Sequence, residues 1–149
     1  MQNIDAKMIE EIVRKIIMEK INISQDKFEK HIDPSGVIAV KTSTVKLEKF
    51  DTGKAEDKVF LKDVLTLKES PRLGCGVMEM KASTFDWTLK YDEVDVILEG
   101  TLEIVIDGRR VVGNKGDIIF IPKDSSIQFS ASEYAKFIYI VFPANWSEQ

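Results

Sequence analysis

The pattern of hydrophobic residues after Val37 most limits what this chain can fold into. From there onward, short runs rich in Val, Ile, Phe and Thr alternate with polar residues and are separated by Gly, Asp, Asn and Pro. A period of two is typical of antiparallel β-strands. Asp107 and Gly108 indicate a tight hairpin, and residues 113–117 indicate a second turn. Closely spaced strands joined by such turns favour a sandwich or barrel of the jelly-roll kind. The predicted strands are 37–47, 58–67, 73–80, 93–99, 101–106, 109–112, 118–121, 126–129 and 134–142.

The N-terminal segment follows a different period. Aliphatic residues recur every three or four positions from Ile4 to Ile21, and charged residues fill the other face, which predicts an amphipathic α-helix. Glu10 and Arg14 are spaced for an i, i+4 ion pair on the charged face. A helix this short is marginally stable alone. Its aliphatic stripe should therefore pack on the chain's own barrel, at a dimer seam or on another protein. The stripe comprises Ile4, Met8, Ile9, Ile12, Val13, Ile16, Ile17 and Ile21.

The length of 149 residues leaves room for one domain with one hydrophobic core. We expect the helix at 1–22, a connector at 23–36 and the barrel domain at 37–149. The connector contains a turn signal at residues 33–36, Asp-Pro-Ser-Gly. His31, the single histidine, falls in this connector, and we expect it to be exposed to solvent.

Charge and composition narrow the classes of partner. A net charge of -4 without blocks of like charge argues against nucleic acid. No stretch approaches the ~20 apolar residues that a membrane span needs, and the charged N-terminal segment is unlike a secretory signal. Cys75 is the single cysteine, which excludes an internal disulfide and fits a reducing compartment. We expect a cytoplasmic protein whose Cys75 is an unreactive core residue.

Two segments carry the identity of the barrel: FDWTLKYDEVDVILEGTLEI at 85–104 and GDIIFIPKDSSIQF at 116–129. They resemble the two motifs of the cupin superfamily. Glu93 and Gly100 hold the spacing of the first motif, and Gly116 and Pro122 hold that of the second. The resemblance implies an all-β fold, the cupin double-stranded β-helix or jelly-roll barrel, with an N-terminal amphipathic α-helix before it. Cupin barrels often pair, so we expect a homodimer.

The histidines that bind metal in cupins are missing from both segments. The second motif has Ile127 at its histidine position. The paired histidine positions of the first motif fall near Asp86 and Thr88, or on Trp87 and Leu89 if the spacer is shorter. Neutral imidazoles normally provide most ligands of such a site. We therefore expect no tightly bound transition metal, although Glu93 could help to hold magnesium beside substrate phosphates.

A narrower resemblance covers nearly all of residues 37–146. The runs WTLKYDEVDVILEG, GDIIFIPKDSSIQF and FPANW are similar to those of the EutQ family of ethanolamine utilisation. The resemblance implies a role in ethanolamine catabolism inside a bacterial microcompartment. It also implies an acetate kinase activity that interconverts acetate and ATP with acetyl phosphate and ADP. The helix at residues 4–21 would then dock on microcompartment shell or cargo proteins.

The strand predicted to begin at Glu93 carries two carboxylates on one face. Alternation places Glu93, Asp95 and Ile97 on one side and Val94, Val96 and Leu98 on the other. We expect the second trio to face the core, which leaves the carboxylates in the barrel mouth. Two close carboxylates away from water repel each other, so one should have a raised pKa. In the alternative interpretation both are partly solvated and hydrogen bonded.

If the barrel catalyses phosphoryl transfer, magnesium and ATP are the expected cofactors. Glu93 and Asp95 would bind the magnesium, and Tyr91 would orient acetate. Lys123 would hold phosphate oxygens, although plain solvent exposure is the better explanation of a lysine in this turn. The expected substrate-binding residues are Asp86, Trp87, Thr88 and Lys123. Plain packing explains Trp87 and Tyr91 equally well.

The chain has no P-loop sequence, and no other phosphoryl-transfer signature stands out. A non-catalytic function therefore stays open, in which a metal-free cupin barrel binds a small metabolite or organises other microcompartment proteins. A metal-dependent cupin oxygenase or isomerase is disfavoured by the missing histidines.

Overall fold

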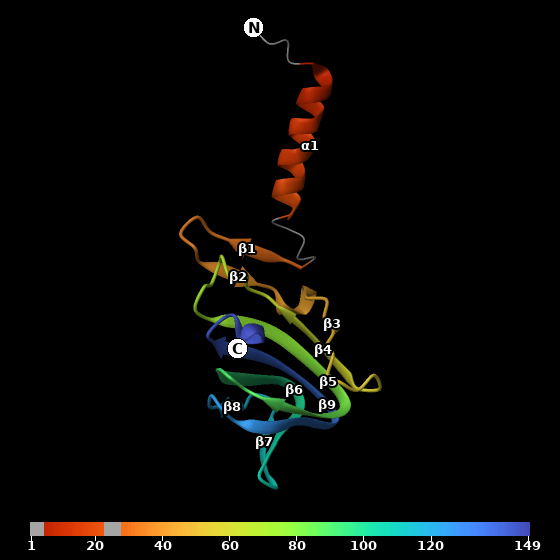
Figure 1. The fold of residues 1–149 in the computed structure, drawn as a ribbon, viewed down its shortest axis with the longest axis vertical. Coiled ribbons are helices and arrows are strands. Elements are labelled where there is room, and N and C mark those ends of the chain that lie inside the picture. The colour runs from red at the N-terminus through yellow and green to blue at the C-terminus, as the bar shows by residue number, and fades with distance from the viewer. Residues whose placement is uncertain (1–4, 23–27) are drawn as a thin grey trace.

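A computed structural model describes residues 5–22 and 28–149, with only the backbone described for residues 18–22. One helix precedes a chain of antiparallel strands (Figure 1). The elements are α1 (Ala6–Asn22), β1 (Lys30–Ile32), β2 (Ile38–Val40), the 3-10 turn η1 (Thr42–Thr44), β3 (Glu48–Lys49), β4 (Lys58–Asp63), β5 (Gly74–Thr88), β6 (Asp92–Ile106), β7 (Arg109–Asn114), β8 (Ile118–Ile121), β9 (Ser126–Phe142) and the 3-10 turn η2 (Trp146–Glu148).

The main sheet has the strand order β3-β4-β5-β9-β6-β7, and β8 pairs with β6. β1 and β2 form a separate two-stranded sheet. The long strands β5, β6 and β9 curve around the core, as Figure 1 shows. Their pairing shifts register between Lys81 and Ser83 on β5, and twice on β6. Such irregularities let a strand bend and close a barrel.

Gly100 lies at one of these bends in β6, between two shifts of register. Its φ of +73° is left-handed, and a Cβ there would lie 2.1 Å from the carbonyl oxygen of Tyr134. Only glycine fits such a close approach of two strands. The glycine of the first motif is therefore required by the backbone.

The core fills the inside of the curved sheet. Phe85, Phe129 and Phe137 stack in sequence through it, with ring centroids 5.3 and 6.4 Å apart. The inward positions of β5, β6 and β9 supply most of the other buried side chains. The all-β barrel with one N-terminal helix agrees with the prediction from the period of the sequence.

Several predicted strand limits were wrong. The strand predicted at 37–47 ends at Val40 and gives way to the turn η1. The strands predicted at 93–99 and 101–106 form one continuous strand, β6, because Gly100 bends the strand without ending it. The pair predicted at 126–129 and 134–142 is likewise one strand, β9. β5 runs on to Thr88, eight residues past the predicted end at Met80, because it pairs with β9 along this length.

Helix α1 stands apart from the strands in Figure 1. Its hydrophobic residues from Met8 to Ile17 are each about half exposed, between 46% and 52%. Arg14 donates to Glu10 at 2.9 Å on the polar face, as the spacing predicted. The end of the stripe at Ile21, and Ile4, lie outside the described side chains. Within the described residues, no helix is long and apolar enough to cross a membrane.

Candidate functional site: an aromatic cavity with a buried carboxyl pair

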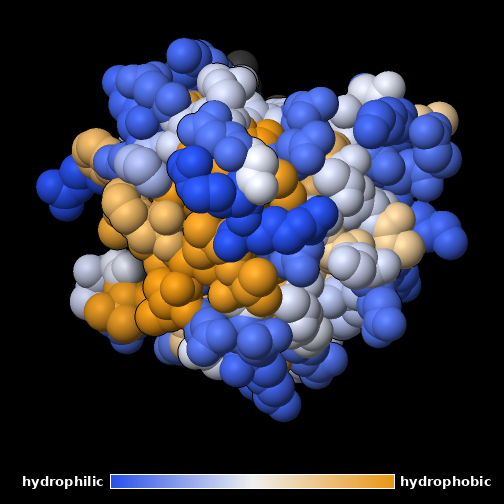
Figure 2. Space-filling view, turned by 90° about the horizontal axis from the view of Figure 1, so that it is seen from below, coloured by the Kyte–Doolittle hydropathy of each residue, from blue (hydrophilic) through white to orange (hydrophobic). Residues whose placement is uncertain are grey.

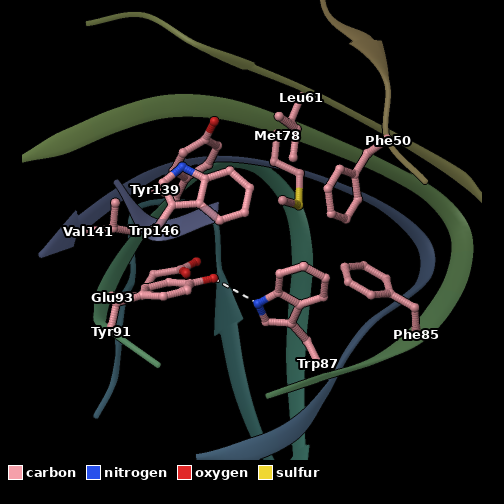
Figure 3. A pocket seen from close by; sticks show the side chains of 10 residues that line it. All are labelled: Phe50, Leu61, Met78, Phe85, Trp87, Tyr91, Glu93, Tyr139, Val141 and Trp146. Atoms are coloured by element: carbon pink, nitrogen blue, oxygen red, sulfur yellow. Dashed lines mark hydrogen bonds between the residues drawn. The ribbon is translucent and has the colours of Figure 1, made fainter. Parts of the chain in front are cut away.

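A cavity opens inside the barrel between the ends of β4, β5, β6 and β9 and the C-terminal turn η2. Figure 3 shows the side chains that surround it. Its interior admits little more than a water-sized group, and its empty space, mouth included, is about 300 Å³. The lining residues are Phe50, Leu61, Met78, Phe85, Trp87, Tyr91, Glu93, Tyr139, Val141 and Trp146. Aromatic rings therefore dominate the wall, and Glu93 brings the only carboxyl group that the described residues contribute to it.

Glu93 and Asp95 both point inward from β6. Glu93 is 4% exposed and Asp95 is 0% exposed. Ile97 follows them on the same face and is also buried, whereas Val94, Val96 and Leu98 are half-buried on the outer face. The expectation that this trio faces the core was therefore wrong. The face of β6 that carries Ile97 is the concave face of the bent strand, so the carboxylates point into the barrel interior. The apolar side chains of the outer face lie beside those of β8 and β9.

Burial controls the electrostatics of this pair. It raises the pKa of Asp95 well above the usual range, and the charge of Glu93 and a hydrogen bond with it raise it further. Burial also raises the pKa of Glu93, while the hydrogen bond with Asp95 lowers it. Burial therefore disfavours the charged form of Asp95 more than that of Glu93. Among the described residues, the oxygens of Asp95 have no hydrogen-bond partner apart from Glu93.

Tyr91 and Trp87 form a polar contact within the aromatic wall. The indole N–H of Trp87 donates to the hydroxyl of Tyr91 at 2.7 Å, the dashed line in Figure 3. Burial raises the pKa of Tyr91, and the charge of Glu93 adds to this rise. The Tyr91 hydroxyl therefore stays protonated at neutral pH. It can still donate its own proton to a group in the cavity.

Asp63 anchors the other side of the wall. The Tyr139 hydroxyl donates to Asp63 Oδ1 at 2.6 Å, and the indole N–H of Trp146 donates to the same atom at 3.3 Å. Burial and then the charge of Asp63 raise the pKa of Tyr139. These bonds hold the turn η2 against the ends of β4 and β9. Trp146 consequently closes one side of the cavity.

The structure gathers only some of the residues selected from the sequence. Glu93, Tyr91 and Trp87 line the cavity, and Asp95 lies behind Glu93. Asp86 and Thr88 are exposed on the opposite face of β5, where they bond to Gln128 and Ser126 of β9. They border a separate surface hollow.

Lys123 also lies outside the cavity wall. It is exposed, and its backbone N–H donates to Asp92 Oδ1 at 2.8 Å. The turn that contains Lys123 is hydrogen bonded to the turn that precedes Tyr91, because the N–H of Asp124 donates to the carbonyl oxygen of Leu89. Lys123 is thus part of the rim near the start of β6.

Sequence reasoning missed Phe50, Tyr139 and Trp146 as wall residues. Phe50 lies beside the short strand β3, which the sequence did not predict, and its ring centroid is 5.5 Å from that of Trp87. Tyr139 occupies an inward position of β9, which alternation alone could have indicated. Trp146 was visible in the run FPANW, but no pattern assigned that run to the cavity.

The positions of the cupin histidines do not form a metal site. Ile127 is buried in the core opposite Trp87. In the described part of the chain, no three His, Cys, Asp or Glu side chains come together to hold a metal. His31 is exposed on β1, as expected. Cys75 is half-buried and its pKa is raised by burial, so its thiol is not activated.

Comparison with known proteins places the chain in a family. Residues 4–148 match the family model described as ethanolamine utilisation protein EutQ. The chain belongs to the EutQ family. It is 53% identical to a Clostridioides difficile protein named acetate kinase EutQ, over 99% of this chain and 97% of that protein. It is 34% identical to the Escherichia coli protein of the same name, over 93% of this chain but only 61% of that protein.

Solved structures support the same assignment. The structure of the Clostridium difficile EutQ protein superposes with a TM-score of 0.80 and 54% identity, covering 82% of this chain and 91% of that one. A Salmonella typhimurium structure described as a putative ethanolamine utilization protein gives 0.76 and 36%, covering 79% of this chain and 95% of that one. The cupin domain of Schizosaccharomyces pombe Cnp3, at 15% identity and a TM-score of 0.57, covers 74% and 77% of the two chains. The EutQ-family barrel therefore has the cupin fold.

Proposed function

We propose that this EutQ-family protein works in ethanolamine utilisation as an acetate kinase, within a bacterial microcompartment. The supporting observation is the 53% identity, over 99% of the chain, to a protein named acetate kinase EutQ. Acetate kinases exchange a phosphoryl group between ATP and acetate. The oxygen of the acetate carboxylate attacks the terminal phosphorus, and the bond to the bridging oxygen of ADP breaks.

The rim of the barrel is the place where this reaction fits the chain best. Magnesium would arrive with the nucleotide and be held mainly by the phosphates, with Glu93 as the carboxylate at the cavity wall, because Asp95 is fully buried behind it. The narrow cavity cannot admit a nucleotide, so its phosphates would lie outside the wall, near Lys123 and Lys90. Lys90 borders the outer hollow beside Trp87 and Tyr91. Tyr91 is the hydroxyl that would orient acetate at the mouth.

Purified protein incubated with acetate, ATP and magnesium tests this proposal. Acetyl phosphate, trapped as the hydroxamate, should form in proportion to the protein added. The host should lack its own acetate kinases, so that contamination cannot supply the activity. A folded protein that makes no acetyl phosphate under these conditions would reject the kinase proposal.

A second function is favoured by a specific observation, the chemistry of the cavity. Its wall, as far as the described residues form it, has no lysine or arginine, which phosphoryl-transfer sites use to neutralise charge. An aromatic cavity with one carboxyl group suits the binding of a small molecule without catalysis. In this case the protein would sense or hold a metabolite, or organise other microcompartment proteins.

Two surfaces suit the partners that we propose. Figure 2 shows hydrophobic surface on the side where β7 and β8 lie, and the exposed side chains there are Val111, Val112, Ile118 and Phe120. We propose that a second copy of the chain covers this face in a homodimer. The half-exposed stripe of α1 is the surface that would dock on shell or cargo proteins.

A further inference from the structure

We propose that the barrel cavity is a binding site for a small primary ammonium compound with the size and chemistry of ethanolamine. This inference goes beyond the kinase proposal, because acetate and phosphate are anions and the cavity is built for a cation. It is carried by the aromatic wall, the unpaired carboxyl oxygens behind it and the absence of a basic group from the lining.

The aromatic rings surround the space from several sides. The Trp146 ring centroid lies 5.9 Å from that of Tyr91, 6.3 Å from that of Trp87 and 6.3 Å from that of Tyr139. The rings in each pair are steeply inclined to one another, at 59° to 73°. Figure 3 shows Trp146, Tyr91 and Trp87 around one space with Glu93 beside Tyr91. The faces of Trp and Tyr rings attract cations through their quadrupoles.

The buried carboxyl pair requires a positively charged partner if it is to ionise. Glu93 reaches the wall, and Asp95 is fully buried on the same face of β6. In the part of the chain that the structure describes, the oxygens of Asp95 have no hydrogen-bond partner apart from Glu93. A buried polar group without a partner costs about 1–3 kcal/mol, and more when it is charged. Among the residues that the structure describes, no lysine or arginine lines the cavity to supply that partner.

The carboxylate oxygens and the aromatic ring faces of the cavity favour some cations over others. A primary ammonium group carries three N–H donors, which can satisfy carboxylate oxygens and lie against aromatic faces together. A quaternary ammonium group has no donor and is too large for an interior that admits little more than a water-sized group. A metal ion bound without its own ligands would need several donor side chains, and Glu93 is the one carboxylate in the described lining, which has no histidine or cysteine. The cavity chemistry therefore matches an –NH3⁺ group on a short chain.

The rest of the ligand would extend toward the mouth. The Tyr91 hydroxyl accepts from Trp87 and keeps its own proton free to donate, so a hydroxyl group on the ligand has a partner there. An acetate ion placed in the interior would face the Glu93–Asp95 pair and no positive charge. The interior of the cavity should therefore exclude acetate, which under the kinase proposal binds at the mouth, outside the wall.

Intrinsic fluorescence provides a direct test, because Trp87 and Trp146 are the only two tryptophans of the chain and both line the cavity. Full-length protein is titrated at fixed ionic strength with ethanolamine, ethylene glycol and tetramethylammonium. Ethylene glycol keeps the size but replaces the ammonium group with a hydroxyl. Tetramethylammonium keeps the charge but has no N–H donor. We expect a saturable change with ethanolamine and none with the other two at tenfold higher concentration.

A pair of variants locates the response. Glu93→Gln should weaken ethanolamine binding at least tenfold, since it removes the charge that faces the cavity. Glu99→Gln, an exposed position on the same strand, should leave the affinity unchanged. Equal responses to ethanolamine and ethylene glycol in the unmodified protein would overturn the proposal, even if Glu93→Gln fails to fold. No response to ethanolamine, or an unchanged affinity in a folded Glu93→Gln variant, would also overturn it. None of these outcomes depends on acetyl phosphate formation, which is assayed separately.

Discussion

Asp95 is fully buried in the barrel, and among the described residues no N–H or O–H donor forms a hydrogen bond to its carboxylate oxygens. Burial raises its pKa, with the charge of Glu93 as the second cause. An unfolded Asp has a pKa of about 3.9. Below that pH the Asp95 carboxyl is protonated in both the folded and the unfolded state, so its ionisation does not change the free energy of unfolding. As the pH rises toward the higher folded pKa, the unfolded state ionises first, so the folded state loses stability.

Replacing this carboxyl with a neutral amide should therefore stabilise the protein. Asp95→Asn keeps the shape and can donate an N–H to Glu93, while the titration disappears. We expect a gain on the order of 1–3 kcal/mol in the free energy of unfolding at pH 8, the usual cost of a buried polar group that lacks a partner. The gain should shrink at pH 5. Urea unfolding at both pH values measures it.

Asp86→Asn is the matched control, since Asp86 is exposed on β5. It should change the unfolding free energy little at either pH. A folded Asp95→Asn variant that is less stable than the unmodified protein by the same amount at pH 5 and pH 8 would show that Asp95 does not carry this cost.

The candidate site could be predicted only in part at the level of single residues. Alternation along β6 placed Glu93 and Asp95 on one face, but it could not say which face the bend of the barrel makes concave. The polar pair therefore turned inward against the expectation from hydrophobicity. Phe50 and Trp146 reach the cavity from distant segments, and this contact depends on tertiary packing that no local pattern encodes.

At the scale of elements, the bend in β6 depends on Gly100. Gly100→Ala would bring a Cβ within 2.1 Å of the Tyr134 carbonyl oxygen and also strain a φ of +73°. Gly108 has the same φ of +73° but no atom within 4 Å of a Cβ. Left-handed strain costs about 1–2 kcal/mol. We expect Gly108→Ala to lose about that amount, and Gly100→Ala to lose at least ~2 kcal/mol more, in chemical denaturation. Equal losses would show that the close approach to Tyr134 is not a constraint.

Removal of the N-terminal helix α1 should affect partner binding but not the stability of the barrel. The hydrophobic side chains of α1 described from Met8 to Ile17 are half exposed, and no strand is seen to cover them. Its removal should therefore take no core from the barrel. A chain starting at Asn22 should melt within about 2 °C of the full chain but fail to co-purify with microcompartment shells. Thermal melting and shell co-purification measure the two effects.

A large fall in melting temperature with unchanged shell association would contradict this account of α1. The helix would then bury its stripe within the protein, on the barrel or at a dimer seam. Each buried aliphatic side chain would contribute about 1.5–3 kcal/mol in that case.

Most elements could be predicted from the sequence, and their limits could not. The hairpin at Asp107 and Gly108 and the strand at 118–121 matched, because turn residues and period are local signals. The long strands were split where Gly100 or a polar stretch interrupts the period. These strands stay continuous because neighbouring strands supply their hydrogen bonds, which only the assembled sheet reveals.

For the whole molecule, the lost cupin histidines predict a protein without a resident transition metal. Ile127 occupies one position, and the exposed Asp86 and Thr88 lie near the others. Elemental analysis of protein purified without chelators should find far less than one zinc, iron, nickel or manganese per chain. A stoichiometric amount of any of these would require ligands that the described residues do not bring together.

We propose that the mouth of the barrel cavity, with Glu93 at its wall, is the working site of this EutQ-family protein. The most direct measurement is the rate of acetyl phosphate formation from acetate and MgATP by the unmodified protein, Glu93→Gln and Glu99→Gln. Melting curves of all three confirm folding. We expect at least a tenfold lower rate for Glu93→Gln, because this change removes the charge with little change in volume. We expect an unchanged rate for Glu99→Gln. Full activity in a folded Glu93→Gln variant would contradict it and place the reaction elsewhere on the protein.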